Sequence, residues 1–228
     1  MIVYGRNPVR EALRGRREVT RIWATAEPDD TPVDVVSESE LEGLCGSPDH
    51  QGICAEVSDY PYADAADLLE ADDALVLCLD EVQDPRNLGA VCRVAECAGA
   101  AGVVIPRHRA ADVTPAVCKA SAGAVEHLPV ARVRNVADWL GEAKAAEAWV
   151  YGAAADGGVA WDEPDYRGRV VLVLGSEGRG LRPRVASACD QLVALPVRGR
   201  IASLNVSAAA AALVYGILQV RKALDTSP

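Results

Sequence analysis

The sequence has no phenylalanine, and aromatic residues make up only 4% of its 228 residues. The core of any folded domain must therefore be built mainly from Ala, Val and Leu. Basic residues are missing from residues 26–75, a stretch that contains fifteen Asp or Glu and no Lys or Arg. The net charge of −10 comes from this stretch, which is typical of a solvated face that keeps a protein soluble.

Membrane, disulfide and metal signals are also lacking. The longest nearly uninterrupted apolar run, 208–218, is too short for a bilayer, which takes ~20 residues, and the first residues have no signal-peptide apolar segment. The seven cysteines are odd in number and have no Cys-x-x-Cys spacing, which favours reduced core cysteines over disulfides or zinc. The three histidines are scattered. We therefore expect a cytoplasmic protein with no membrane partner and no metal.

Apolar residues make up 50% of the chain and charged residues 25%, which is ordinary for a globular protein. The length fits one α/β domain, alone or with a small appendage. The appendage is predicted at the amino terminus as helix 6–14, strands 19–25, 32–36 and 52–57, and helix 38–44. The link 26–31 is too short for a helical crossover, which takes about a dozen residues. Either the strands it joins are not parallel neighbours, or the unit is shortened.

From residue 74 onward, short apolar segments alternate with helical patterns. Residues 60–73 before them are predicted to be a linker with a helical turn at 65–70. The alternation predicts a parallel sheet covered on both faces. The expected strands are 74–79, 102–105, 128–133, 148–153, 170–174 and 192–196, and the expected helices are 87–98, 114–122, 136–146, 181–187 and 203–224.

Positive charge is concentrated in the first 25 residues, which hold six Arg and two Glu. Arg6, Arg10, Arg14 and Arg17 recur at helical spacing and would share one face of the first helix. A phosphate-binding face and a merely solvated helix fit this spacing equally well.

Three segments at strand ends contain residues that could do chemistry, because ligands of open parallel sheets bind at that edge. In the first segment, Asp84 is a suitable cap for a helix that begins with Pro85. Asn87 has no obvious structural use. Arg93 stands among apolar helical residues, where a guanidinium needs a bound anion or a buried ion-pair partner.

The other two segments follow later strands. Residues 170–181 run from a buried strand into a glycine-rich turn that lacks the Walker pattern, and Glu177 in that turn disfavours a phosphate cradle. In residues 195–209, Ser203 is the expected N-cap of the last helix. Ser203 has no histidine near it in sequence, so a hydrolase triad is unsupported.

Taken together, the three segments resemble the motifs of the SpoU class of SPOUT RNA ribose 2′-O-methyltransferases. The resemblance covers residues 74–222 densely, and the amino-terminal unit resembles the small L30e-like RNA-binding domain of some members. The matching residues are Asp84-Pro85-x-Asn87-x-Gly89-x-x-x-Arg93, Leu174-Gly175-x-Glu177-Gly178-x-Gly180-Leu181 and Pro196-x-x-Gly199-x-x-x-Ser203-Leu204-Asn205-Val206-Ser207. The amino-terminal cues are residues 4–13 and 50–53.

The resemblance implies an α/β fold with a carboxyl-terminal trefoil knot that holds S-adenosylmethionine. It divides the chain into an L30e-like RNA-binding domain (1–59), a linker (60–73) and a methyltransferase domain (74–228). Members are generally homodimers, and helices 87–98 and 203–224 are the candidates for the contact between subunits. Two-domain members of this layout include enzymes that methylate a guanosine ribose in 23S ribosomal RNA, which is the expected activity here. Transfer RNA is the alternative substrate.

The resemblance also implies residue roles. Arg93 would be the central catalytic residue, Asn87 would share its site, Glu177 would orient Asn87, and Ser203 and Asn205 would position the substrate. Gly175, Leu195, Ile201 and Leu204 would line the cofactor site, and Arg6, Arg10 and Arg14 would bind RNA. Since a guanidinium keeps its proton in proteins, Arg93 is better suited to hold a phosphate and stabilise an alkoxide than to act as a base.

Two further classes of function compete with this reading. A non-catalytic RNA-binding or cofactor-sensing module predicts the loss of at least one of Arg93, Glu177, Ser203 and Asn205, and all four are present. A generic nucleotide-binding domain predicts a ribose-binding acid some 20 residues after the glycine turn, and Asp190 fits that position poorly.

Overall fold

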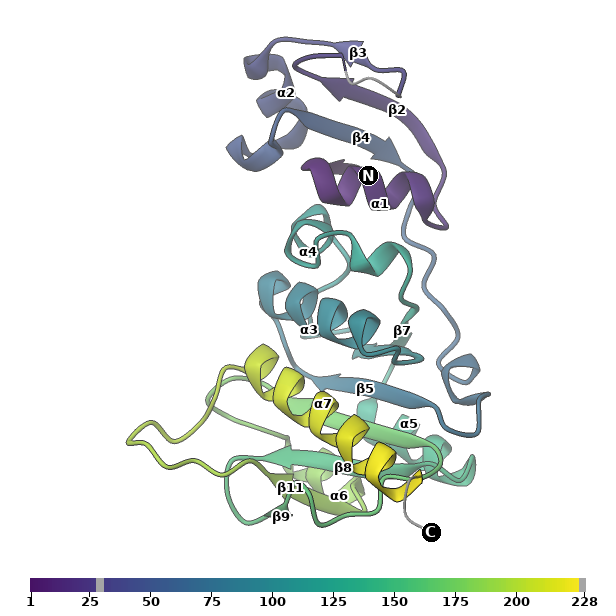
Figure 1. The fold of residues 1–228 in the computed structure, drawn as a ribbon, viewed down its shortest axis with the longest axis vertical. Coiled ribbons are helices and arrows are strands. Elements are labelled where there is room, and N and C mark those ends of the chain that lie inside the picture. The colour runs from purple at the N-terminus through teal and green to yellow at the C-terminus, as the bar shows by residue number, and fades with distance from the viewer. Residues whose placement is uncertain (28–30, 226–228) are drawn as a thin grey trace.

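The computed structural model describes residues 1–27 and 31–225, which form two sheets stacked along the long axis of the molecule (Figure 1). The amino-terminal sheet has the strand order β1-β4-β2-β3. Only β2 and β3 of that sheet are parallel, and β4 is antiparallel to both β1 and β2. Its elements are β1 (Ile2–Tyr4), α1 (Arg6–Arg14), β2 (Val19–Ala24), β3 (Asp34–Val35), α2 (Glu38–Cys45), the 3-10 turn η1 (Pro48–His50) and β4 (Ile53–Val57).

The strands β2 and β3 are parallel neighbours despite the short link between them. The predicted obstacle of a helical crossover does not arise, because β3 pairs only with the last two residues of β2, Trp23 and Ala24. To enter β3, the chain therefore runs back along only about two residues of β2 and not along the whole strand. Residues 28–30 of the link lie outside the described residues.

The second sheet has seven strands in the order β7-β6-β5-β10-β8-β11-β9, and every pairing in it is parallel, as predicted. The two-residue strand β9 was not expected from the sequence. The elements are η2 (Asp67–Leu69), β5 (Leu75–Asp80), α3 (Pro85–Cys97), β6 (Gly102–Pro106), α4 (Pro115–Ala120), η3 (Ala124–Glu126), β7 (Val130–Val133), α5 (Val136–Ala145), β8 (Trp149–Ala154), β9 (Val159–Ala160), β10 (Val170–Gly175), α6 (Pro183–Ala188), β11 (Gln191–Ala194) and α7 (Val206–Asp225).

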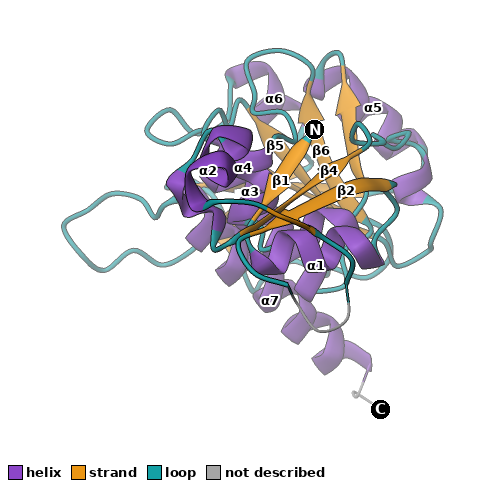
Figure 2. Ribbon diagram, turned by 90° about the horizontal axis from the view of Figure 1, so that it is seen from above, coloured by secondary structure: helices purple, strands orange, loops and turns teal. Residues whose placement is uncertain are grey.

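Helices cover both faces of this sheet, as the view along the long axis shows (Figure 2). Side chains alternate across β5: Leu75, Leu77 and Leu79 pack with α3, α4 and α7, and Val76 and Cys78 pack with α5 and α6. This alternation on a strand buried on both sides explains why the sequence reads as an uninterrupted apolar run. Cys54, Cys78, Cys92 and Cys118 are buried, as expected of core cysteines, whereas Cys97 is exposed.

A buried ion pair joins the amino-terminal unit to the unit with the seven-stranded sheet. Arg17 donates hydrogen bonds to both carboxylate oxygens of Glu126, and both side chains are almost completely buried. The spacing of Arg17 predicted that it shares an exposed face with Arg6, Arg10 and Arg14. This prediction is wrong. The reason is that α1 ends at Arg14 and Gly15 follows, which turns the next residues toward η3.

Strand pairing determines where two of the three candidate segments begin. The strands β5 and β10 are neighbours, with Asp80 opposite Gly175 at their carboxyl ends. Asp84 caps α3 as predicted, since its carboxylate accepts a hydrogen bond of 2.8 Å from the Arg86 backbone N–H. The loops after β5 and β10 thus leave the sheet side by side. The knotted threading remains a prediction.

No helix among the described residues is long and apolar enough to cross a membrane.

Candidate active site

Three side chains from the three candidate segments form one hydrogen-bonded network. The Asn87 amide donates a hydrogen bond of 3.0 Å to Glu177 Oε1. The Asn205 amide donates to Asn87 Oδ1 at 3.0 Å and also to Glu177 Oε1. Asn87 is buried in the first turn of α3, whereas Glu177 and Asn205 are on exposed loops. The structure therefore brings together three of the five predicted catalytic residues.

The Asn205 side chain is held by the helix that follows it. Its Oδ1 accepts hydrogen bonds of 2.9 Å from the Ser207 N–H and 2.6 Å from the Ser207 hydroxyl, which is the geometry of an N-cap. The helix α7 begins at Val206, so the prediction that Ser203 caps it is wrong. Residues 201–205 are loop, and the cap falls to the polar residue next to the first helical one.

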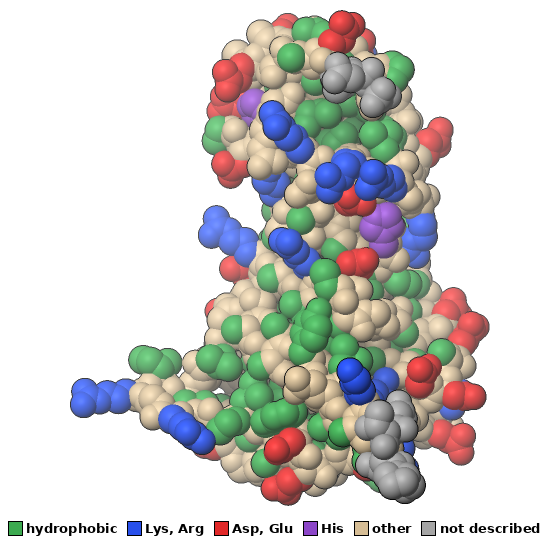
Figure 3. Space-filling model, viewed as in Figure 1, with side chains coloured by type: hydrophobic (Ala, Val, Ile, Leu, Met, Phe, Trp, Pro, Cys, Tyr) green, Lys and Arg blue, Asp and Glu red, His purple; other side chains and the backbone are tan. Residues whose placement is uncertain are grey.

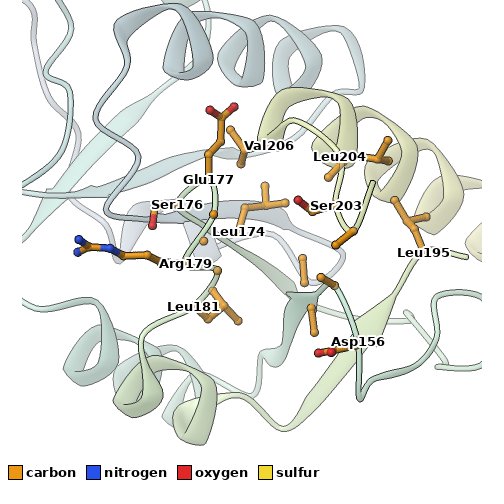
Figure 4. A pocket seen from close by; sticks show the side chains of 18 of the residues that line it. Asp156, Leu174, Ser176, Glu177, Arg179, Leu181, Leu195, Ser203, Leu204 and Val206 are labelled. Carbon is orange, nitrogen blue, oxygen red and sulfur yellow. The ribbon is translucent and has the colours of Figure 1, made fainter. Parts of the chain in front are cut away.

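A cavity of about 450 Å³ lies beside this network, within the usual size range of small-molecule sites (Figure 4). Its walls come from the loops after β8, β10 and β11 and from the start of α7. Most of its lining side chains are apolar or small. The lining residues are Ala153–Asp156, Leu174–Leu181, Ala186, Leu192, Leu195, Val197, Ala202–Leu204, Val206, Ala209 and Leu213.

Three of the four predicted cofactor residues line this cavity, and the fourth does not. Gly175, Leu195 and Leu204 line it, and so does Ser203. Ile201 does not line it and is 77% exposed, because it lies on the projecting part of the loop after β11. Sequence reasoning missed the wall after β8, including Asp156, because no chemical motif marks that turn. The strand–loop alternation was the only signal that pointed there.

Position 175 requires a glycine, because the backbone of the following turn comes very close to it. A Cβ at this position would lie 2.1 Å from the Gly180 carbonyl carbon and 2.4 Å from the Leu181 nitrogen. The turn closes with a hydrogen bond of 2.9 Å from the Gly180 N–H to the Ser176 carbonyl. No side chain fits inside this ring, so the glycine sets the shape of the cavity wall.

A buried carboxylate fixes the far end of the same turn. Asp80 is fully buried and accepts hydrogen bonds of 2.9 Å from the Arg182 N–H and 2.8 Å from Arg182 Nε. The hydrogen bond with Asp80 raises the pKa of Arg182. Sequence reasoning did not single out this pair, which joins the end of β5 to the end of the glycine turn.

Arg93 lies apart from the network. It follows Asn87 by six residues, which in an α-helix is about 9 Å along the axis and on another side. Its side chain is exposed, and it makes no ion pair or hydrogen bond with the described residues. The expected buried partner is absent from them because the apolar neighbours of Arg93 face the core while Arg93 faces outward.

Basic side chains gather around α1 on the face of the molecule shown in Figure 3. Arg6, Arg10 and Arg14 are all exposed on this helix. Glu11 pairs with Arg10 at 2.9 Å and lies 3.7 Å from Arg14, so part of the charge is balanced. The loop after β11 also projects from the body and has basic side chains near its tip (Figures 1 and 3).

Family models match both parts of the chain. Residues 74–215 match the SpoU rRNA methylase family, and residues 2–63 match the substrate-binding domain of RNA 2′-O ribose methyltransferases. The chain is 38% identical over 96% of its length to the uncharacterized tRNA/rRNA methyltransferase slr0955 of Synechocystis sp., of which it spans 62%. It is 37% identical, again over 96%, to the putative TrmH family tRNA/rRNA methyltransferase YacO of Bacillus subtilis, of which it spans 95%.

Solved structures agree with these matches. An RNA 2′-O ribose methyltransferase superimposes with a TM-score of 0.84 at 26% identity, covering 97% of this chain and 89% of that one. An AdoMet-bound rRNA methyltransferase from Sinorhizobium meliloti superimposes with a TM-score of 0.83 at 25% identity, covering 96% and 86%. By these matches over both sheets, the chain belongs to the SpoU rRNA methylase family of RNA methyltransferases.

Proposed function

We propose that the protein transfers the methyl group of S-adenosylmethionine to a ribose 2′-hydroxyl of RNA, and that the acceptor is a guanosine of 23S ribosomal RNA. The observation that carries this proposal is the network of Asn87, Glu177 and Asn205 at the border of the 450 Å³ cavity. The AdoMet-bound relative from Sinorhizobium meliloti supports the choice of methyl donor.

The cavity fits such a donor. Its walls contain backbone turns and apolar side chains, which suit an adenosine held by main-chain groups. Gly175, Leu195 and Leu204 would hold the cofactor. Position 175 must be glycine, because a side chain there would collide with the backbone of the turn. The bound cofactor supplies a methyl group on a positively charged sulfur.

The residues of the chain align and polarise the acceptor. Glu177 borders the cofactor cavity and holds the Asn87 amide, so the two side chains form a fixed polar edge against which a ribose can be oriented. Arg93, which lies apart from this edge, would bind a phosphate of the RNA. Among the described residues it has no hydrogen-bond or ion-pair partner, so its donors are available for that phosphate.

RNA and a second copy of the chain are the proposed partners. Arg6, Arg10 and Arg14 on α1 offer an exposed basic face to RNA. The homodimer would form through α3 and α7, where Tyr215 is an exposed aromatic residue of α7. Large apolar side chains, Val197, Ile201 and Leu204, are also exposed on the loop that leads into α7.

Transfer RNA is the second candidate substrate, because relatives are named tRNA/rRNA methyltransferases. The substrate-binding unit at residues 2–63 favours ribosomal RNA. The test is to incubate the purified protein and labelled S-adenosylmethionine with unmodified 23S RNA and, separately, with unmodified tRNA. We expect label in 23S RNA. Label in tRNA alone would reverse the assignment of the substrate.

A further inference from the structure

Basic side chains are concentrated where β6 and β7 end. Residues 107–114 and 130–135 contain four Arg and one Asp, a net charge of +3 with His neutral, whereas the whole chain has a net charge of −10. All four arginines are exposed, and they are Arg107, Arg109, Arg132 and Arg134. We call these four residues the basic edge patch. A positive patch on an acidic protein is typical of a surface that binds a polyanion.

The basic edge patch is continuous across the two strands. β6 and β7 are parallel neighbours, and the Arg107 N–H donates a hydrogen bond of 2.8 Å to the Val133 carbonyl. Arg107 therefore lies beside Arg134, at the same edge of the sheet as the glycine turn. Neither of these two side chains has a hydrogen-bond or ion-pair partner in the described part of the chain. Their guanidinium donors are available to an anion from solution.

Contacts with β7 fix one side of the loop after β6. The Arg132 guanidinium stacks on the Tyr62 ring, with 3.8 Å between its central carbon and the ring centroid, and its Nη1 lies 3.3 Å from Asp112 Oδ1. The Tyr62 hydroxyl donates to Asp112 at 3.3 Å and accepts a hydrogen bond of 2.9 Å from the Val113 N–H. Because Arg132 is already held in place, it loses less conformational entropy when it binds a phosphate.

Contacts with the segment after β5 fix the other side of this loop. The Ala111 N–H donates a hydrogen bond of 3.0 Å to the Val82 carbonyl, and Arg109 Nη1 lies 3.5 Å from Glu81 Oε1. Arg109 and Glu81 both have a left-handed backbone, with φ of +59° and +60°. This conformation is costly for residues with a side chain and is concentrated at functional sites. The Arg109 side chain is still 75% exposed, so the ion pair leaves most of its donors free.

A second cavity, of about 370 Å³, connects this loop to the proposed acceptor site. Its lining includes Glu81, Val82 and Asn87, and it shares Glu177 with the cofactor cavity. Because Arg109 and Ala111 contact residues that line the second cavity, the basic edge patch begins at its rim. Neighbouring strands lie about 4.8 Å apart, so the end of β7 is on the order of 10 Å from that rim. An RNA strand with its ribose against Asn87 and Glu177 would therefore carry its next phosphates over the patch.

We propose that the basic edge patch binds phosphates of the RNA strand beside the acceptor nucleotide. This inference rests on the proposed function and adds a second contact surface, apart from α1, for the same RNA. Phosphate contacts fix the position of a strand and carry no sequence information directly. The patch therefore holds the strand in register with the two cavities and does not select the base.

The test is the salt dependence of RNA binding by the full-length protein. A short fluorescent oligouridylate is titrated between about 50 and 200 mM KCl, and binding is followed by fluorescence anisotropy. For single-stranded RNA, each phosphate contact contributes about 0.7 to the slope of log affinity against log salt. We expect Arg107→Ala and Arg134→Ala each to reduce this slope by about 0.7 and to lower the affinity at least about twofold. Arg134→Lys keeps the charge and should keep the slope.

The matched control is Arg167→Ala. Arg167 is exposed and pairs with Asp165 in the loop that precedes β10, at the opposite edge of the sheet. Its loss changes the net charge by the same amount as the test variants, so it reports any general effect of charge. We expect the slope and the affinity of the unaltered protein.

Unchanged slopes in Arg107→Ala and Arg134→Ala would overturn the patch, and so would an equal decrease in Arg167→Ala. A decrease in only one of the two test variants would remove the other arginine from the patch. No methyl transfer is measured in these titrations. A protein that shows the expected slopes but methylates no RNA would therefore contradict the proposed function and not the patch.

Discussion

Asn205 and Asn87 are 118 residues apart in sequence, and the amide of the first donates a hydrogen bond of 3.0 Å to the amide oxygen of the second. This contact joins the start of α7 to the start of α3, and Glu177 accepts from both amides. Two helix starts and a glycine turn are thus fixed relative to one another beside the cavity.

Asn205 caps α7 with its amide oxygen and donates hydrogen bonds to Asn87 and Glu177 with its amide nitrogen. Two substitutions separate these contributions. Asn205→Ala removes the N-cap of α7 and should lower the free energy of unfolding by about 1 kcal/mol. Asn205→Ser keeps a capping oxygen and should restore most of that stability. Both variants lose the amide that donates to Asn87 and Glu177, so both should lose most methyl transfer. Urea unfolding and initial rates are the measurements, and a fully active Asn205→Ser would contradict the network's role.

Arg93→Ala should lower methyl transfer and leave cofactor binding unchanged, because Arg93 does not line the cofactor cavity and is proposed to contact an RNA phosphate. A hydrogen bond to a charged group is worth about 1.5–3 kcal/mol, which corresponds to roughly 10- to 100-fold in rate. Calorimetric titration with S-adenosylmethionine and single-turnover rates provide the comparison. Arg184→Ala, which breaks only an exposed ion pair with Asp138, is the control and should behave as the unaltered protein does. Normal turnover by Arg93→Ala would refute the assignment.

Gly175→Ala should weaken cofactor binding at least about tenfold, because the added methyl group must displace the backbone of Gly180 and Leu181. Gly199→Ala is the matched control on the loop after β11, where nothing lies within 4 Å of the added Cβ. Calorimetric affinities of the two variants for S-adenosylmethionine test this. Equal affinities would mean that the turn does not shape the cofactor site.

Glu126→Ala should destabilise the protein by about 3–5 kcal/mol, since it leaves Arg17 buried without its counter-charge. Replacing both residues, as Arg17→Met with Glu126→Leu, should recover much of that loss. Urea unfolding of the single and double variants measures both effects. A cost below about 1 kcal/mol for the single variant would show that the pair does not hold the two units together.

Acid should loosen the same junction through Glu11 and His127. Their side chains are 3.0 Å apart, and the hydrogen bond with His127, followed by that with Arg10, lowers the pKa of Glu11 below its ordinary 4.5. Because the pKa is lower in the folded protein, this stabilisation is complete above about pH 4.5 and is lost as the pH falls through the folded value. Unfolding between pH 3 and 6 should show this loss, and Glu11→Gln should remove this part of the pH dependence. An identical pH profile in that variant would contradict it.

The parallel sheet was predictable because strands buried on both faces leave long apolar runs in the sequence. The contact of Asn87 with Glu177 was implied by the family resemblance, and it arises because β5 and β10 are neighbours that end at one edge. The direction in which side chains point was harder to predict from the sequence. The apolar neighbours of Arg93 gave no indication that it faces outward, and Arg17 fits a helical spacing that the chain abandons after Arg14.

Other features depend on geometry that leaves no sequence signal. Asn205 caps α7 in place of Ser203 because the loop continues two residues further than the spacing suggests. The left-handed backbone of Glu81 and the burial of Asp80 under Arg182 arise from how the turns pack. Local propensity does not report such contacts between distant segments.

The most direct test of the central claim is the position of the transferred methyl group on the nucleoside. Unmodified 23S RNA, methylated by the purified protein with labelled S-adenosylmethionine, is digested to nucleosides and analysed by mass spectrometry. The account predicts that the label is in 2′-O-methylguanosine and that Glu177→Ala removes it. Label on a base, or undiminished label with Glu177→Ala, would contradict a site in which these three loops align a ribose hydroxyl with the methyl donor.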